Sequence, residues 1–524
     1  MMAAHLPEVM RIGQARLTAG LDRFTRLDLQ AHQEVFGTLR RVTAQQLIEM
    51  TQRVDLRGRG GAAFPFSRKL AAVSQAATGR KCKPVILVNG SEGEPGSAKD
   101  AMLLLRSPYL VLSGALLAAS ALGSREIVIG TGRGDVAESV AAALKAEPQL
   151  RRLGRVVVVP GQFVSGEAGA LVNAVNGDPA LPPGRKRRAS DSGVRGRPTL
   201  LSNAETFAQL AVLGLLGPDG YASTGTADEP GTVLLTVGGH ATRPVVVEVP
   251  AGTSLGTVLD ICGVGGPDSV LVGGYHGKWL PGEIADDVPV SRAGLEEAGG
   301  TLGAGIVLPL PAGTCPLGEV ARVARYLAAE SSGQCGPCRL GLPGIARALS
   351  ALADGAGGLE ALEGARRTAA AVRGRGACKH PDGTSRFIVS ALEVFTDDLA
   401  AHALRGGCGR PVRGVLPLPT VGGESKLVVD WTRCEGHGLC ARLVPELATL
   451  DQQGYPVFLD MPVPFWLERD AQQAVGMCPA LALRLEPVAG LTAGGRRGVR
   501  APGGSLTGTV VARGVAGSPT LVGK

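Results

Sequence analysis

Two cysteines three residues apart stand in the glycine-rich stretch ESSGQCGPCRLG, residues 330–341. Cys335 and Cys338 have the spacing at which thiolates bind zinc, form a redox pair or hold an iron–sulfur cluster. A C-x2-C-x2-C run with a remote fourth cysteine commonly surrounds a four-iron cluster, but here Ser332 occupies the first position. The remote cysteine is Cys378, in RGACKHPDG. This stretch therefore offers three thiolates and one hydroxyl.

A second group of cysteines lies near the end of the chain. Five residues separate Cys434 from Cys440, and Cys478 follows at a distance with a proline directly after it. His437 stands midway between the first two. Three thiolates suit a [3Fe–4S] cluster, and a [4Fe–4S] cluster is the alternative. His437 is either a fourth ligand or a polar neighbour, and the sequence favours the neighbour.

The cellular compartment decides how the ten cysteines are interpreted. The first residues, MMAAHLPEVMRIGQ, lack the basic-then-apolar order of a signal peptide, so we expect a cytoplasmic protein. In a reducing compartment, close cysteine spacings indicate metal or redox chemistry rather than disulfides. The other four cysteines stand alone in the sequence and are expected to be small buried residues: Cys82, Cys262, Cys315 and Cys408.

A glycine-rich loop, LRGRGGAAFPF at residues 56–66, offers a second kind of chemistry. Glycines at this position let backbone N–H groups approach a phosphate closely. Arg59 and Lys69 supply positive charge beside it. The loop predicts a nucleotide or flavin phosphate site, although an isolated loop of this kind is more often only a turn.

Four separated blocks resemble one family. They are GRGGAAFPFSRK (58–69), VNGSEGEPGSAKD (88–100), GRPTLLSNAETF (196–207) and ESSGQCGPCRLG (330–341). The blocks are similar to the NADH-binding, FMN- and [4Fe–4S]-carrying subunit of respiratory complex I, which has relatives in soluble hydrogenases and formate dehydrogenases. They occur in the family order over roughly residues 15–405.

The resemblance implies the site residues and the chemistry. Hydride passes from the nicotinamide to the flavin, which releases electrons singly, so no side chain is expected to act as a catalytic acid or base. Phe64 and Glu94 are implied to lie near the nicotinamide nucleotide. The implied FMN contacts are Gly58, Gly60, Gly61, Lys69, Asn89, Glu92, Gly166, Glu167, Ser202 and Asn203.

The sequence also departs from the family pattern. The family usually has Asp at Ser91, Tyr at Phe163, Glu at Ala168 and Asn at Ser202, so polar contacts to flavin or nucleotide are lost. At the cluster, the three cysteines match the family spacing, which favours a bound cluster over an empty loop. It is either [3Fe–4S] on three thiolates, or [4Fe–4S] with Ser332 as a harder oxygen ligand.

The second cysteine group has a resemblance of its own. VDWTRCEGHGLCARLVPELATLDQQGYPVF (429–458) and VGMCPALALRLE (475–486) are similar to the small actinomycete-type ferredoxins that serve haem-thiolate monooxygenases. His437 stands where four-iron ferredoxins place their second cysteine. The resemblance implies an electron carrier at the end of the chain.

The elements that position these residues follow from the hydrophobic pattern. Short β-branched runs at 84–88, 126–130 and 155–159 alternate with alanine-rich helical stretches at 98–122 and 135–147. Strand–helix alternation predicts a parallel sheet covered by helices. The fold class is therefore α/β for this part of the chain. The resemblances imply that it is the FMN domain and that a small β-grasp-like domain, a helical bundle with the Fe–S site and an α+β ferredoxin-like domain follow.

Composition shifts divide the chain, whose 524 residues are too many for one core. The Pro/Gly-rich stretch 409–426 is predicted to be a linker, and the Gly/Ala/Arg/Ser-rich tail from residue 489 is predicted to be disordered. The predicted parts are an N-terminal helical region (1–56), the FMN/NADH-binding domain (57–228), the β-grasp-like domain of SLBB type (229–305), the helical Fe–S domain (316–408), the linker (409–426), the ferredoxin-like domain (427–488) and the tail (489–524).

Charge and hydropathy exclude some partners. The net charge is +8, concentrated in residues 184–197 and 494–504, but aromatics make up only 3% and there is no nucleic-acid module, so solvated loops are expected. The longest apolar run, 109–122, is too short to span a membrane and is expected to be a buried helix.

These observations predict that one chain carries a complete electron-transfer route, here called the electron line. It runs from NADH or NADPH through FMN and two clusters to an external protein acceptor, such as a haem-thiolate monooxygenase. A thioredoxin-like [2Fe–2S] subunit is a further possible partner. The alternative is a docking scaffold for the ferredoxin whose flavin half has lost dehydrogenase activity, as Ala168 and Ser202 would allow.

Overall fold

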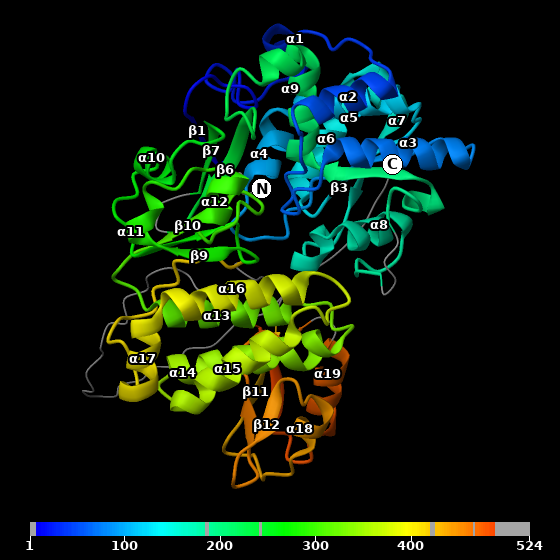
Figure 1. The fold of residues 1–524 in the computed structure, drawn as a ribbon. Helices are drawn as coiled ribbons and strands as arrows, with labels where there is room; N and C mark the ends of the chain where they lie inside the picture. Colours follow the sequence, from blue (N-terminus) through cyan, green and yellow to red (C-terminus); the bar gives the residue numbers. More distant parts are fainter. Residues whose placement is uncertain (1–6, 184–187, 240–243, 420–424, 465–466, 488–524) are drawn as a thin grey trace, which may run out of the picture.

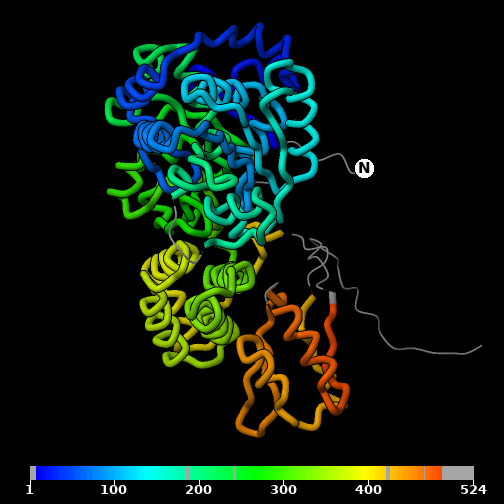
Figure 2. Tube along the Cα trace, turned by 90° about the vertical axis from the view of Figure 1, so that its right-hand side faces the viewer, coloured from blue at the N-terminus to red at the C-terminus, as the bar shows by residue number. Residues whose placement is uncertain are grey.

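A computed structural model describes residues 7–183, 188–239, 244–419, 425–464 and 467–487 (Figures 1 and 2). The predicted disordered tail and the basic stretch at 494–504 lie outside the described residues, and the basic stretch at 184–197 lies there in part. The predicted α/β class, with a parallel sheet, a helical bundle and smaller sheets, is confirmed.

The first sheet is four-stranded and parallel, in the order β4-β3-β2-β5. The two central strands, β3 and β2, are buried and rich in valine, isoleucine and leucine, as expected where helices cover both faces, while the edge strand β4 is half-buried. They are β2 (Val85–Asn89), β3 (Ile127–Thr131), β4 (Gly154–Val158) and β5 (Thr199–Asn203). The accompanying helices are α1 (Leu29–Phe36), α2 (Ala44–Arg53), α3 (Phe66–Gly79), α4 (Lys99–Arg106), α5 (Pro108–Leu122), α6 (Gly134–Ala146), α7 (Pro148–Leu153), α8 (Ala168–Asn176) and α9 (Ala204–Tyr221).

Helix α5 is the apolar run that the sequence placed in the core. It starts with Pro108 in its first turn and ends at Gly123, which takes the left-handed conformation with φ 66°. No single helix among the described residues is long and apolar enough to cross a membrane. Only α4 and α5 together meet the length and composition for a span, and these two helices are bent by 93°.

The second sheet has six strands of mixed direction, in the order β1-β7-β6-β10-β8-β9. It exceeds the predicted range 229–305 at both ends, because the central strand β10 begins at Ile306 and the edge strand β1 comes from the N-terminal region. The prediction that region 1–56 is helical is therefore wrong for β1. The strands are β1 (Glu8–Arg11), β6 (Thr232–Val237), β7 (Val245–Pro250), β8 (Ser269–Val272), β9 (Lys278–Pro281) and β10 (Ile306–Leu310), with the short helices α10 (Leu255–Ile261), α11 (Gly282–Ala285) and α12 (Arg292–Glu297).

A bundle of helices follows, and Figure 1 places it below the two sheet domains. A single π-helical turn, Pro337–Gly341, interrupts the helices and carries Cys338. Such turns are frequent at functional sites. The bundle comprises α13 (Pro316–Ala329), α14 (Leu342–Ala353), α15 (Gly358–Val372), α16 (His380–Val394) and α17 (Thr396–Arg405).

The C-terminal segment is a small α+β unit at the end of the molecule opposite α1 in both views (Figures 1 and 2). One antiparallel pair joins its first and last strands, Ser425 opposite Pro487 through Val429 opposite Leu483. A second pair runs beside two short helices. The elements are β11 (Ser425–Val429), α18 (Leu439–Leu443), β12 (Ala448–Leu450), β13 (Pro456–Phe458), α19 (Glu468–Met477) and β14 (Leu483–Pro487).

The predicted linker 409–426 is a different structure from the flexible joint that its composition indicated. Residues 409–419, here called the strap, are held against the bundle by hydrogen bonds, and Leu416 is fully buried. Ser425 and Lys426 already belong to β11. Proline and glycine predict an absence of regular structure, which the strap does lack, but the sequence does not reveal the bonds that immobilise it.

Candidate functional site

The glycine-rich loop lies against the start of α9. A Cβ added at Gly60 would come within 3.3 Å of the Asn203 Cβ, and Gly61 has φ +99°, which favours glycine. The Arg59 N–H donates to Thr206 Oγ1 at 2.9 Å, and the Gly58 N–H to the Phe64 carbonyl at 3.0 Å. The predicted residues of this loop are thus brought beside Asn203.

The carboxyl ends of the neighbouring strands β2 and β5 lie beside the glycine-rich loop. The register pairs Asn89 of β2 with Asn203 of β5. Asn89 Nδ2 donates to the Gly166 carbonyl at 2.8 Å, and Lys69 Nζ donates to the Leu201 carbonyl at 3.1 Å. In open parallel sheets, ligands bind in the crevice outside this edge. The structure therefore gathers the loop and residues 69, 89, 166 and 203 at the expected edge.

A buried charge network lies behind this edge, and the sequence analysis did not single it out. Lys99 Nζ is 2.9 Å from Glu205 Oε2 and 3.2 Å from Asp100 Oδ2. Asn203 Nδ2 donates to Asp100 Oδ2 at 2.5 Å. Burial alone would lower the pKa of Lys99. The neighbouring carboxylates of Asp100, Glu205 and Glu92 outweigh this effect and raise the pKa of Lys99 above its ordinary value. The only sign of this network in the sequence is the adjacent pair of opposite charges, Lys99 and Asp100, at the end of the block 88–100.

The carboxylate of Glu92, an implied flavin contact, accepts hydrogen bonds from residues at the start of α4. Its oxygens accept the N–H groups of Asp100 at 3.0 Å and Ala101 at 2.9 Å, and the Ser97 hydroxyl at 2.6 Å. Glu92 thereby caps the helix that carries Lys99. In this structure both oxygens of Glu92 therefore bond to the residues around the start of α4.

One polar group at this edge has no hydrogen-bond partner among the described residues, the buried Ser202 Oγ. Arg59 Nε also lacks a hydrogen bond but lies 3.9 Å from Glu205 Oε1. Buried polar groups are normally paired, so Ser202 Oγ fits a site completed by a polar ligand. The glycine loop and the cations Arg59 and Lys69 fit the phosphate of FMN. The Ser202 side chain is one of the departures from the family pattern, and it remains a buried hydroxyl near the end of β5.

Glu94, implied to lie near the nicotinamide nucleotide, connects the two sheet domains. Its Oε1 accepts the Tyr275 N–H, and a Cβ at Gly274 would clash with that oxygen. Burial raises the pKa of Glu94 to about 7, and the Tyr275 N–H offsets part of this increase. Phe64, the other implied nucleotide neighbour, is 45% exposed and available to a ligand.

We expect Glu94→Gln to stabilise the fold at high pH. The folded carboxyl titrates near 7 and the unfolded one near 4.5, so the stability of the wild type falls as pH rises through this window. The loss totals about 3 kcal/mol above pH 7. The unfolding temperature of Glu94→Gln should exceed that of wild type at pH 8 and match it at pH 5. Glu138→Gln, on an exposed position of α6, should change neither, and equal behaviour of both variants would contradict the buried titration.

The first cluster site collects the four predicted side chains. Cys335 Sγ is 3.6 Å from Cys338 Sγ, and Ser332 Oγ is 3.9 Å from Cys338 Sγ. Cys378 lies near both cysteines, and burial, with smaller effects of Glu167 and the two thiols, raises the pKa of Cys378 to about 12. Three cysteine thiols and a buried hydroxyl fit an iron–sulfur cluster, whose usual ligands are cysteine thiolates.

Glu167 is related to both the implied FMN site and the first cluster site. It begins α8 and belongs to the implied FMN contacts, yet its charge reaches Cys378. Burial raises the pKa of Glu167. A residue implied to contact the flavin thus lies within electrostatic reach of a cysteine of the first cluster site.

Aromatic and imidazole rings fill the same boundary. The Phe163 ring centroid lies 4.8 Å from that of His276 and 5.3 Å from that of His380. The Phe163 N–H donates at 2.7 Å to Oε2 of Glu330, which lies two residues before Ser332. These contacts fix the flavin domain to the cluster loop, and only tertiary structure reveals them.

We expect Ser332→Cys to strengthen the first cluster. The Ser332 side chain is buried and its hydroxyl faces Cys338, so a thiol there would supply a fourth sulfur ligand. Iron at this site should persist several-fold longer in air than in wild type, followed by visible absorption. Ser331→Cys, one position away, serves as the matched control. A shorter lifetime in Ser332→Cys than in wild type would contradict this geometry.

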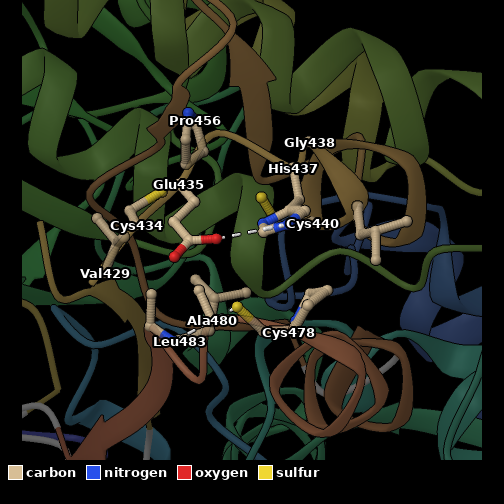
Figure 3. Close-up of a pocket in the computed structure, with 13 residues that line it drawn as sticks. Val429, Cys434, Glu435, His437, Gly438, Cys440, Pro456, Cys478, Ala480 and Leu483 are labelled. Carbon is tan, nitrogen blue, oxygen red and sulfur yellow. Dashed lines mark hydrogen bonds and ion pairs between the residues drawn. The ribbon is translucent and has the colours of Figure 1, made fainter.

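The second cluster site is a hollow in the ferredoxin-like segment (Figure 3). Cys434, Cys440 and Cys478 all line it. His437 also lines it and pairs with Glu435, its Nε2 lying 3.7 Å from Oε2. The Ala482 N–H donates to Cys478 Sγ at 3.4 Å, as backbone donors do around iron–sulfur clusters. Three thiolates around one hollow fit an iron–sulfur cluster, and His437 lines the same hollow.

The four cysteines expected to stand alone divide into two kinds. Cys82 and Cys262 stay outside any metal-ligand group in the described part of the chain. Cys315 and Cys408 do not stand alone, because the fold brings them together with His402. The long stretch of chain between these two cysteines hid their proximity from the sequence analysis.

Family models match three parts of the chain, in the predicted order. They are the Nuo51 FMN-binding domain (residues 51–212), the NADH-ubiquinone oxidoreductase-F iron–sulfur binding region (319–402) and a 4Fe–4S single cluster domain (427–485). The matches confirm the resemblance drawn from the sequence and the FMN and iron–sulfur cofactors. They also cover all three cysteines of the second cluster site.

Known relatives point to the same family. The F subunit of NADH-quinone oxidoreductase from Mycobacterium tuberculosis is 30% identical over 386 residues, which are 69% of this chain and 85% of the relative. The corresponding protein of Streptomyces coelicolor is 29% identical over 409 residues, 73% and 89% of the two chains. A crystal structure of NAD+-reducing [NiFe]-hydrogenase in the air-oxidized state matches with a TM-score of 0.66 and 27% identity, covering 76% of this chain and 68% of that chain. The chain belongs to the family of the NADH-quinone oxidoreductase F subunits and is an FMN- and iron–sulfur-binding oxidoreductase of the NADH dehydrogenase type.

Proposed function

We propose that this chain passes electrons from NADH through FMN and the cluster at Cys335, Cys338 and Cys378 to the cluster at Cys434, Cys440 and Cys478, and then to an external protein. FMN, when bound, supplies the conversion of a two-electron hydride into single-electron steps. The chain's own residues hold the carriers in order. The observation that carries the proposal is the contact between the ferredoxin-like segment and the loop of the first cluster.

That contact begins one residue after a cluster ligand. Arg339 follows Cys338, and its guanidinium donates to Glu446 Oε1 at 3.2 and 3.0 Å. Arg347 of α14 donates to the Glu446 carbonyl at 3.2 Å. Glu446 is 6% exposed and lies six residues after Cys440. A short connection that is buried on the Glu446 side supports direct transfer between the two clusters.

Apolar packing extends the same interface. One continuous cluster of buried side chains includes Leu349 and Leu352 of the bundle and Val444 and Leu447 of the ferredoxin-like segment. A carrier packed in this way holds one orientation, whereas a tethered carrier would search for its partner. This supports a fixed relay.

The boundary between flavin and first cluster supports the preceding step. Phe163 and Glu167 of the flavin domain meet His380 and Cys378 of the bundle. The protein's part here is to exclude water and fix the distance between carriers. We propose NADH as the donor, in line with the family, with NADPH as the alternative.

The acceptor is expected to dock at the exposed side of the second cluster. His437 is 42% exposed, Trp431 is 60% exposed and Leu481 is 70% exposed. We propose a protein of the haem-thiolate monooxygenase class, or another redox enzyme, as acceptor. A thioredoxin-like [2Fe–2S] subunit remains the proposed partner at the flavin end.

The test is anaerobic purification followed by titration with NADH. Visible spectra should show flavin bands that bleach, and electron paramagnetic resonance should show both clusters reduced, with iron and acid-labile sulfide matching two clusters. Fe–S absorption without flavin would instead establish a scaffold for the ferredoxin. A colourless protein without labile sulfide would refute both.

A further inference from the structure

Three metal-ligating side chains that belong to neither cluster site meet at the base of the strap. The ligand atoms of Cys315, His402 and Cys408 all lie within 4.8 Å of one another. Cys315 immediately precedes α13, His402 lies in α17, and Cys408 immediately precedes the strap. Cys315 and His402 are 2% and 4% exposed, and Cys408 is half-buried.

The spacing of these atoms suits one tetrahedral ion. Zinc bonds of about 2.3 Å to sulfur and 2.0–2.1 Å to nitrogen place tetrahedral ligand atoms roughly 3.5–3.8 Å apart. Cys315 Sγ and His402 Nε2 are 3.3 Å apart, which is within a few tenths of an ångström. Small side-chain movements would therefore complete the geometry.

The histidine is already oriented as a ligand. The Leu352 carbonyl can only accept a hydrogen bond, so His402 Nδ1, 3.2 Å away, carries the proton. This leaves the lone pair of Nε2 directed at Cys315. A histidine that binds metal through one nitrogen typically donates the other N–H to a carbonyl or carboxylate.

Charges around the two thiols are also balanced for a divalent ion. The Gly318 N–H donates to Cys315 Sγ at 3.3 Å, at the start of α13. Arg410 lies beside Cys408 and pairs with Asp398, so neither contributes an uncompensated charge. Two thiolates and one zinc ion would be neutral in this buried place.

We propose that Cys315, His402 and Cys408 bind a zinc ion that fixes the strap to α13 and α17. Sulfur and imidazole ligands are those that zinc prefers, and three protein ligands leave a fourth position for solvent on the open side of Cys408. Binding releases the two thiol protons and changes no oxidation state. The site is independent of the electron line, since it shares no residue with either cluster.

The test compares zinc in full-length variants. Anaerobically purified protein with its clusters intact is equilibrated with zinc and desalted, and zinc, iron and sulfide are measured on the same sample. We expect about one zinc ion per wild-type chain and nearly none in Cys408→Ser, with iron and sulfide equal in both. Cys262→Ser, a lone half-buried cysteine, should retain zinc. Zinc should also raise the unfolding temperature of wild type but not of Cys408→Ser.

Three results would overturn the proposal. Wild type that retains no zinc has no such site. Zinc retained equally by Cys408→Ser and by His402→Gln lies elsewhere, for example in place of iron. An intact mass two hydrogens lighter, restored by reductant, would establish a Cys315–Cys408 disulfide in place of a metal site. Each of these leaves flavin reduction by NADH unaffected and so separates this proposal from the proposed function.

Discussion

Cys440→Ala is expected to abolish electron transfer from NADH to an external haem acceptor and to leave flavin reduction at the wild-type rate. Cys440 is buried, lines the hollow of the second cluster and lies in the first turn of the short helix α18. Removing one of its three thiolate ligands should prevent the second cluster from binding, so electrons can no longer pass from the first cluster to the acceptor. Stopped-flow absorbance measures flavin bleaching, and reduction of an added haem protein measures the whole line.

The matched control is Cys262→Ala, which removes a half-buried thiol far from either cluster group in sequence. It should retain both activities. Resonance from the first cluster should still develop with NADH in Cys440→Ala, because that cluster precedes the break. Loss of flavin reduction together with acceptor reduction, in a variant that remains folded, would overturn the order of the carriers.

The parallel sheet and its site could be predicted because their signals are local. The runs at 84–88, 126–130 and 155–159 lie within a residue of β2, β3 and β4, since a buried parallel strand is a continuous apolar run. The pairs Cys335/Cys338 and Cys434/Cys440 are likewise spaced within short stretches, whereas Cys378 and Cys478 are assigned through the family resemblances. Where a signal is contained in a few neighbouring residues, one sequence is sufficient to find it.

The features that escaped prediction depend on distant partners. Strand β1 has four residues and no alternation of its own, and it forms only because Glu8–Arg11 pairs with residues 245–248. The Lys99–Glu205 pair and the Cys315–His402–Cys408 group each join residues from separate elements. Nothing near these residues in the sequence reports their partners, so only the assembled fold places them.

The strap is the most consequential of these cases. Composition at 409–426 indicates a flexible linker, yet the strap is bonded to the start of the bundle. The Cys315 N–H donates to the Pro411 carbonyl at 2.9 Å, and the Arg413 N–H to Thr314 Oγ1 at 3.1 Å. The carrier at its far end is therefore positioned by specific side chains, and one of these is accessible to a test.

Glu319→Ala is expected to release the strap from the bundle. The carboxylate is fully buried in α13, accepts the Gly414 N–H at 2.5 Å and the Leu416 N–H at 3.4 Å, and pairs with Arg322 at 2.6 Å. Its loss leaves two strap amides and a largely buried cation without their acceptor, which should cost about 3 kcal/mol. Hydrogen exchange at the two amides should then accelerate roughly 100-fold, since each 1.4 kcal/mol is a factor of about ten.

The same variant tests whether the strap serves the electron line. With the strap free, the second cluster would lose part of its fixed orientation, so its reduction by NADH should slow while flavin reduction is unchanged. Glu363→Ala removes an exposed Glu–Arg pair of the same three-residue spacing, 2.9 Å from Arg366, and should alter stability by less than about 1 kcal/mol. Fast exchange with an unchanged rate of cluster reduction would show that the strap is dispensable for transfer and that the contacts of the bundle with Glu446 and the apolar interface hold the carrier.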